Sequence, residues 1–242
     1  MNGNVFARIE ARTVQGTVVD LVRDAIISGV IEPGEKLTES TIARQMAVSR
    51  APLREALREL EQEGLILRIP NRGCVVVSLT EHDIVEIFSL RSDLECMAIR
   101  WAIPNLTADD FVTLQTIIEA SRQAIQMLDL DELTRLDMQF HEYITSRACH
   151  GRLMRAWYTN NYQARMLLNG RFRTLSDYTP DTVIRDHTAI LNALQQGDAD
   201  AAIAITEQVA ARVIRECTQI LRNRANGRPV AAELGARPML VG

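Results

Sequence analysis

The chain has 242 residues, of which 47% are hydrophobic and 24% are charged, and its formal net charge is −4. This charge excludes binding to nucleic acid through a strongly basic overall composition, and the length is sufficient for two ordinary domains. No apolar run approaches the roughly twenty residues of a membrane span, and residues 1–10 lack the apolar core of a signal peptide. We therefore expect a cytoplasmic protein. The scattered cysteines form no Cys-x-x-Cys pair, which argues against a zinc ribbon or a redox motif.

Three helices are expected before residue 65. Apolar residues recur at helical spacing over residues 13–28, and a short helix is expected over 38–46. A third helix spans 49–63, with Ser49 as its N-cap and Pro52 in its first turn, where the missing N–H of proline costs nothing.

The hydrophobic pattern then changes from helical to alternating. Residues 65–69 and 74–77 indicate two short strands, and the Pro-Asn-Arg-Gly sequence at 70–73 indicates the turn between them. Three helices followed by a hairpin are typical of a winged helix-turn-helix. We therefore expect residues 1–78 to form this DNA-binding domain.

The rest of the chain is helical in pattern and shows no further strand. Thr80 and Thr107 are expected N-caps, because each is followed three residues later by an acid, Asp83 and Asp110. The expected helices span 80–102, 107–128, 131–149, 152–168, 181–196 and 198–224. The fold is thus mainly α, with residues 79–224 forming an all-α antiparallel bundle. Residues 225–242 lack periodicity, and we expect them to be a disordered tail.

The third helix carries the pattern that indicates DNA binding. Its apolar residues form one stripe, whereas Arg50, Arg54 and Arg58 recur every four residues on another face. Arg50 and Arg54 lie near the helix N-terminus, the end that enters the major groove in helix-turn-helix proteins, where a guanidinium can bind guanine O6 and N7. Taken alone, such a row is more often a solvated face with arginine–glutamate pairs. The short helix before it and the hairpin after it favour the DNA-binding interpretation.

Four segments resemble the GntR family of bacterial regulators, in the order and spacing of that family. They are residues 31–37 (Ile-Glu-Pro-Gly-Glu-Lys-Leu), 48–57 (Val-Ser-Arg-Ala-Pro-Leu-Arg-Glu-Ala-Leu), 63–65 (Glu-Gly-Leu) and 70–73 (Pro-Asn-Arg-Gly). The resemblance implies a homodimer that binds a pseudo-palindromic operator in double-stranded DNA. It also implies DNA contacts from six residues of the helix and wing: Ser49, Arg50, Pro52, Arg54, Arg72 and Gly73.

The second domain resembles the FCD effector domain of the FadR-like subgroup. The resemblance rests on residues 87–95 (Ile-Phe-Ser-Leu-Arg-Ser-Asp-Leu-Glu), 136–141 (Leu-Asp-Met-Gln-Phe-His), 186–194 (Asp-His-Thr-Ala-Ile-Leu-Asn-Ala-Leu) and 197–202 (Gly-Asp-Ala-Asp-Ala-Ala). It implies a bundle of six or seven helices with an internal pocket for a small effector, often an organic acid.

Asp137, His141 and His187 are the candidate metal ligands and effector contacts. Asp137 and His141 are four residues apart and share one helix face, while His187 lies on a later helix. Carboxylate and imidazole together suit zinc, nickel or manganese. The resemblance implies a fourth, histidine ligand, but that position is Val209, which cannot bind a metal. The alternative is an Asp–His hydrogen bond beside a structural histidine.

Two arginines are further candidates for effector binding. Arg91 could either pair with Glu95 one helical turn away or bind an effector carboxylate, and Arg165 is a similar candidate. The function expected from all these features is ligand-responsive transcriptional regulation, with repression favoured by family analogy, and not enzymatic activity. Two alternatives remain open at this stage: a metal-dependent hydrolase built on a helical bundle, and a DNA-binding protein without a ligand.

Overall fold

The computed structural model describes residues 14–70, 73–174 and 181–226. The chain divides into two compact units, Met1–Ser78 and Leu79–Gly242, which are described separately below. The expected tail falls mostly on residues 227–242, which lie outside the described part, whereas residue 225 still belongs to the last helix.

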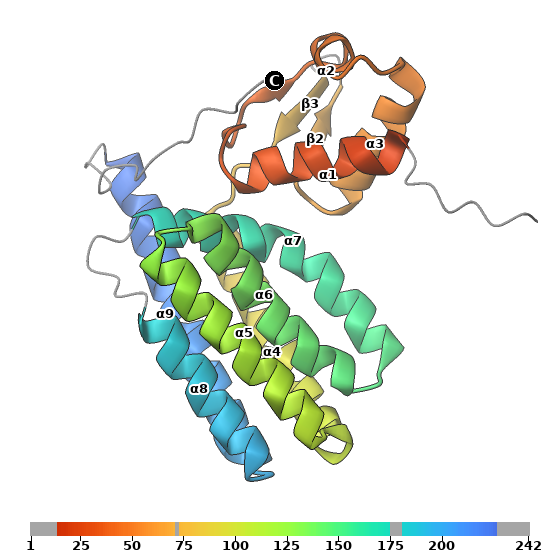
Figure 1. Cartoon of the computed structure of the whole chain (residues 1–242). Coiled ribbons are helices and arrows are strands. Elements are labelled where there is room, and N and C mark those ends of the chain that lie inside the picture. The colour runs from red at the N-terminus through yellow and green to blue at the C-terminus, as the bar shows by residue number, and fades with distance from the viewer. Residues whose placement is uncertain (1–13, 71–72, 175–180, 227–242) are drawn as a thin grey trace, which may run out of the picture. The chain divides into compact units, whose positions relative to one another are not determined.

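The first unit contains three helices and a small sheet in its described part (Figure 1). Helix α1 spans Val14–Ile27, α2 spans Glu39–Gln45 and α3 spans Arg50–Gln62. The strands are β1 (Lys36–Leu37), β2 (Ile66–Ile69) and β3 (Gly73–Val76), arranged antiparallel in the order β1-β3-β2. Sequence analysis missed β1, because two residues are too few to show an alternating pattern.

Packing in the core of the first unit determines which face of α3 is exposed. The apolar stripe of α3 is fully buried and consists of Leu53, Ala56, Leu57 and Leu60. The opposite end of α3 is tied to α1 by Arg23, whose Nε donates to Glu63 Oε2 at 2.8 Å. Because one face of α3 is buried and its C-terminal end is tied to α1, the arginine face of the helix is directed outward.

The second unit is a bundle of long helices, as the sequence predicts (Figure 1). The helices are α4 (Glu81–Ala102), α5 (Ala108–Gln126), α6 (Leu130–Arg147), α7 (Gly151–Thr174), α8 (Asp181–Gln195) and α9 (Ala199–Ala225), with a 3-10 turn at Ile103–Asn105. Helix α7 extends six residues beyond its expected end. Apolar residues in that extension keep the helical spacing, since Leu168 and Phe172 are both buried.

Capping explains why α4 and α5 begin where the sequence predicts. The Thr80 hydroxyl accepts a hydrogen bond from the N–H of Asp83, and Thr107 does the same for Asp110, so both capping boxes are confirmed. Ser49 occupies the expected N-cap position of α3, but its side chain makes no capping hydrogen bond. No helix in the described part is long and apolar enough to cross a membrane.

Candidate DNA-binding surface and ligand site

The exposed face of α3 presents the arginines that the sequence singles out. Arg50 is the first residue of the helix and is exposed to solvent. Arg54 lies one turn further, with 58% of its side chain exposed, and its Nε donates to Glu39 Oε2 of α2 at 3.0 Å. Arg50 and Arg54 are therefore both exposed to solvent, and Glu39 of α2 pairs with Arg54.

The other predicted DNA contacts surround this helix end. Ser49 is exposed and its hydroxyl is not used in capping, while Pro52 is half-buried in the first turn. Gly73 begins β3 with a φ of +85°, a left-handed conformation that favours glycine, and it pairs with Ile69 across the hairpin. Arg72 lies outside the described residues.

A cavity of about 40 Å³ lies inside the helical unit. Helices α4, α6, α7, α8 and α9 all contribute to its wall, and this volume holds about three water molecules. Its charged and histidine side chains are Arg91, Glu95, Asp137, His141, Arg171, Asp186, His187 and Arg212. A cavity with several converging charged side chains in the centre of a bundle is a candidate binding site.

Asp137, His141 and His187 meet at this cavity. All three are buried, and one potential ligand atom from each lies within 4.8 Å of the others. His187 Nε2 lies 3.4 Å from Asp137 Oδ1, and the His187 ring stacks on Phe140 with 4.1 Å between the ring centres. The spacing of α6 and the packing of α8 against the bundle thus bring together the three residues that sequence analysis grouped.

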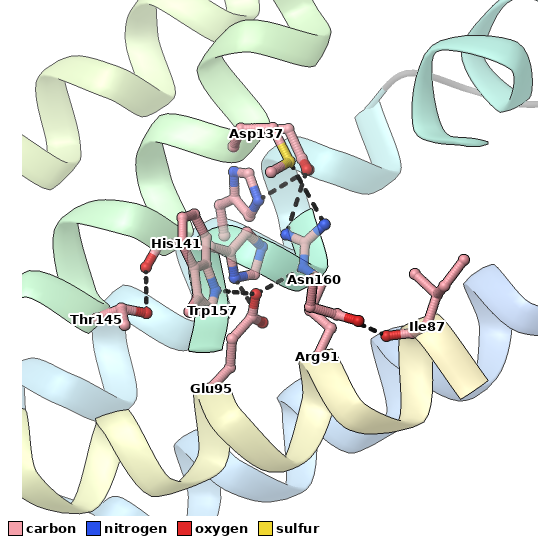
Figure 2. Close-up of polar contacts among 10 residues, drawn as sticks. Ile87, Arg91, Glu95, Asp137, His141, Thr145, Trp157 and Asn160 are labelled. Carbon is pink, nitrogen blue, oxygen red and sulfur yellow. Dashed lines mark hydrogen bonds and ion pairs between the residues drawn. The ribbon is translucent and has the colours of Figure 1, made fainter. Parts of the chain in front are cut away.

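Glu95 belongs to this site, although sequence analysis named it only as a partner of Arg91. It projects from α4 into the group shown in Figure 2. Its Oε1 accepts hydrogen bonds from Arg91 Nε at 2.7 Å and Trp157 Nε1 at 3.3 Å, and its Oε2 lies 2.9 Å from His141 Nδ1. The sequence shows the spacing of Arg91 and Glu95, but only the packing of α4 against α6 reveals the contact with His141.

The environment of Glu95 keeps it ionised. Burial alone raises the pKa of a carboxyl, but the charges of Arg91 and His141 and the hydrogen bonds from both lower the pKa of Glu95 to about 2. Arg91 also lies 3.8 Å from Asp137 Oδ2 through its Nη2. The Arg91–Glu95 pair, one of the two alternatives offered for Arg91, is therefore confirmed. The same guanidinium also lies close to the Asp137 carboxylate.

The pKa values of Asp137 and His187 are both lowered, in ways that suit ligand binding. Burial opposes ionisation of Asp137, but the hydrogen bond with His187 and the nearby positive groups hold the pKa of Asp137 well below its usual range. Burial lowers the pKa of His187, which favours the neutral imidazole. The Nδ1 atom of His187 is buried and has no hydrogen-bond partner. An ionised carboxylate and a neutral imidazole are the forms that bind metal ions.

The donor set fits a divalent metal ion. The contact of His141 Nδ1 with Glu95 leaves Nε2 as its free nitrogen, and a carboxylate behind a metal-binding histidine commonly fixes its orientation. Val209 lines the cavity with an apolar side chain, so the implied fourth ligand is missing. Three protein ligands with open coordination positions are typical of sites where a metal also binds a small molecule.

The lining of the cavity also includes Arg171, Asp186 and Arg212. Arg171 of α7 donates to Glu216, and Arg212 of α9 donates to Asp186 of α8. Sequence analysis named Arg165 of α7 as an effector candidate and did not consider Arg171. The structure places Arg165 outside the residues that line the cavity, where its charge acts on Asp131. Helical spacing alone could not decide which of the α7 arginines faces inward.

Comparison with known proteins identifies both units. The model of bacterial regulatory proteins of the gntR family matches residues 14–76, and the FCD domain model matches residues 86–233. The gluconate operon transcriptional repressor of Bacillus subtilis (strain 168) is 36% identical over 186 residues, covering 73% of this chain and 74% of the relative. That of Bacillus licheniformis is 33% identical over 193 residues, covering 77% and 78%.

A solved structure shares the fold. E. coli McbR/YncC superposes with a TM-score of 0.73 at 22% sequence identity, covering 89% of this chain and 100% of that one. The curated relatives are transcriptional regulators, so the hydrolase alternative is set aside. The chain belongs to the GntR family of bacterial transcriptional regulators, with an FCD domain after its winged helix-turn-helix.

Proposed function

We propose that this regulator is a repressor that binds a pseudo-palindromic operator as a homodimer and responds to a small organic acid bound in the helical unit. The observation that carries the proposal is the buried convergence of Asp137, His141 and His187 at a cavity. Two relatives are named as repressors of a gluconate operon, and gluconate is itself a hydroxylated organic acid.

The DNA contact that we propose begins at the N-terminus of α3. Arg50 and Arg54 project from the first turns of the helix, where a guanidinium can bind the guanine edge in the major groove. The unused hydroxyl of Ser49 is positioned for a phosphate oxygen, and Pro52 lets the helix approach the DNA backbone closely. Gly73 and the neighbouring Arg72 would approach the minor groove from the wing.

In the helical unit, Asp137, His141 and His187 would hold one zinc, nickel or manganese ion. The ion would supply positive charge to which a carboxylate oxygen can bind. The protein side chains alone do not supply this charge, because the lining contains three arginines and three carboxylates: Arg91, Arg171, Arg212, Glu95, Asp137 and Asp186. Each arginine already contacts an acid, so a free carboxylate would otherwise have to displace one.

The lining of the cavity suggests how binding would be communicated. Side chains from α4, α6, α7, α8 and α9 meet there, so a bound effector would contact five helices at once. An effector that binds one arrangement of the helices more tightly than another shifts the population between them. To change DNA occupancy decisively, this difference must reach several kcal/mol.

The DNA part is tested by binding to a duplex that the protein selects from a randomised library. Arg50→Ala and Arg54→Ala should each weaken binding by about 1–3 kcal/mol. Arg122→Ala is the matched control, because Arg122 is an exposed arginine of α5 that pairs with Glu119. If both α3 variants bind the selected duplex like the wild type, with unchanged circular dichroism, the assignment of α3 as the recognition helix is wrong.

The ligand part is tested by metal analysis and thermal unfolding. After purification in the presence of zinc, nickel or manganese, the wild type should retain close to one ion per chain, whereas Asp137→Ala should retain much less. Organic acids should raise the melting temperature of the metal-loaded protein. A metal content near zero contradicts the metal site, and the absence of any shift across a panel of sugar acids and other hydroxy acids favours a ligand-independent regulator.

A further inference from the structure

Lys36 is the only lysine in the chain and lies beside the wing hairpin that β2 and β3 form. It is exposed to solvent in β1 and pairs with Val75 of β3. Its Cε atom would lie 3.8 Å from a Cβ atom added to Gly73, the residue at which β3 begins. Gly73 is two residues closer to the hairpin turn than Val75, so the side chain of Lys36 extends along the sheet toward the tip of the wing.

The ammonium group of Lys36 has no acid partner among the described residues. The carboxylate of the adjacent Glu35 accepts a hydrogen bond from the N–H of Glu32 and does not pair with Lys36. Several arginines of the same unit, in contrast, each pair with an acid: Arg23, Arg54, Arg58 and Arg68. An external anion can therefore bind Lys36 without breaking an existing ion pair.

The position of this charge indicates which anion it meets. The tip of the wing is proposed above to approach the minor groove, and the two phosphate backbones of the duplex form the rims of that groove. A cation set back from the tip of the wing is closer to a rim than to the base edges. Lysine binds phosphate as a point charge on a flexible stem, so it needs no fixed geometry to make this contact.

We propose that Lys36 binds a phosphate of the DNA backbone at the rim of the minor groove and so positions the wing. This contact is additional to the six residues assigned to DNA above, and it rests on the proposed approach of the wing to DNA. A phosphate contact carries no sequence information, because every nucleotide has the same backbone. Lys36 therefore strengthens binding to any duplex, whereas Arg50 and Arg54 discriminate between duplexes.

Fluorescence anisotropy of the full chain on the selected duplex and on a shuffled duplex tests the contact. Lys36→Gln should raise the dissociation constant about fivefold for each bound protomer at about 0.15 M salt, equally on both duplexes. The slope of log affinity against log salt should fall by about one unit for each bound protomer. Unchanged affinity on both duplexes, or a loss confined to the selected duplex, overturns the proposal.

Two further variants separate loss of the charge from other effects. Lys36→Arg keeps a positive charge at this position and should bind both duplexes like the wild type. Arg152→Gln is the matched control, because it removes one exposed positive charge from α7 of the second unit, and it should leave both affinities unchanged. If Lys36→Arg binds as weakly as Lys36→Gln, the charge of Lys36 is not what binds DNA and the proposal is wrong.

The single ε-amine of the chain allows a chemical test that needs no neutral variant. The N-hydroxysuccinimide ester of acetic acid transfers its acetyl group to the deprotonated amine of Lys36, which forms an amide, releases N-hydroxysuccinimide and loses its positive charge. Treated wild type should lose affinity as Lys36→Gln does. Treated Lys36→Arg has the same N-terminal amine but no ε-amine, and it should keep its affinity. Equal losses in the two treated proteins overturn the proposal.

The outcomes separate this contact from the proposed function. If Arg50→Ala and Arg54→Ala bind the selected duplex weakly while Lys36→Gln binds like the wild type, the recognition helix stands and the Lys36 contact is wrong. If Lys36→Gln loses affinity on both duplexes while the two α3 variants bind like the wild type, the Lys36 contact stands and the assignment of α3 is wrong.

Discussion

The two units place their charged groups in opposite environments. In the described part of the first unit, Glu63 is the only buried polar or charged side chain, and it is paired with Arg23 of α1. The second unit buries a whole network, including Arg91, Glu95 and Asp137. The first unit thus keeps its charges where DNA can reach them, and the second keeps them where only a molecule inside the bundle can.

Ion pairs on the surface and in the interior differ in what their loss costs. A surface ion pair such as Arg54–Glu39 contributes little to stability, so it can open when DNA arrives. A buried charge that loses its partner is costly, because the remaining group has neither water nor a counter-ion. The loss of one partner in the interior network should therefore change stability more than the loss of a surface pair does.

The largest effect is expected at Glu95. Glu95→Ala leaves Arg91, His141 and the Trp157 N–H without their acceptor in the core, so the free energy of unfolding should fall by about 3–5 kcal/mol. Glu119→Ala, which removes an exposed acid of α5, should change it by less than about 0.5 kcal/mol. Urea unfolding measures both. Equal changes in the free energy of unfolding for the two variants would contradict the proposed difference between interior and surface charges.

A smaller effect on stability is expected when low pH protonates Asp110, which lies near the start of α5. Burial opposes ionisation of Asp110, but hydrogen bonds from Tyr143 and Thr107 and the charge of Arg147 lower its pKa from 3.8 to about 2. A depressed carboxyl pKa stabilises the folded state above pH 4, and this contribution is lost as the pH falls through 2.

Asp110→Asn should therefore be less stable than the wild type at pH 7 and lose less of its stability between pH 5 and pH 2. Thermal unfolding across that range measures the difference. Asp109→Asn is the control, because the neighbouring Asp109 is exposed. Parallel pH profiles for the wild type and Asp110→Asn would show that the ionised Asp110 carboxylate does not stabilise the contact between α5 and α6.

The smallest effect is expected on the DNA-binding surface. Glu39 holds Arg54 at 3.0 Å and lies 3.9 Å from Arg68. Glu39→Gln removes a negative charge from this face and releases Arg54, while Arg68 keeps its pair with Glu61. Affinity for DNA should therefore rise by about 0.5 kcal/mol, more at low salt than at high salt. Fluorescence anisotropy at two salt concentrations measures this gain. Weaker binding by Glu39→Gln would instead indicate that Glu39 contacts a base directly.

Much of this organisation could be predicted from local sequence signals. The buried stripe of α3 and the Thr80 and Thr107 caps depend on residues close together in the chain, and these predictions are confirmed. The grouping of Asp137 with His141 follows from helical spacing, and the structure brings His187 to the same cavity. The homodimer, the metal ion and the effector stay predictions.

The remainder depends on packing between distant elements. Glu95 reaches His141 only because α4 lies against α6, and periodicity contains no information on that contact. For the same reason, periodicity did not single out Arg171, which lines the cavity, whereas the candidate Arg165 is not among the lining residues. Strand β1 was missed because its two residues take their extended conformation from pairing with β3.

We propose that a ligand in the interior site of the second unit controls DNA binding by the exposed arginines of the first. The most direct test adds the organic acid that stabilises the protein to its complex with the selected duplex and follows DNA release by fluorescence anisotropy. His141→Ala and His187→Ala are compared with the wild type. We expect all three proteins to bind the duplex with similar affinity and only the wild type to be released. Release of both variants at the same acid concentration as the wild type would contradict this proposal.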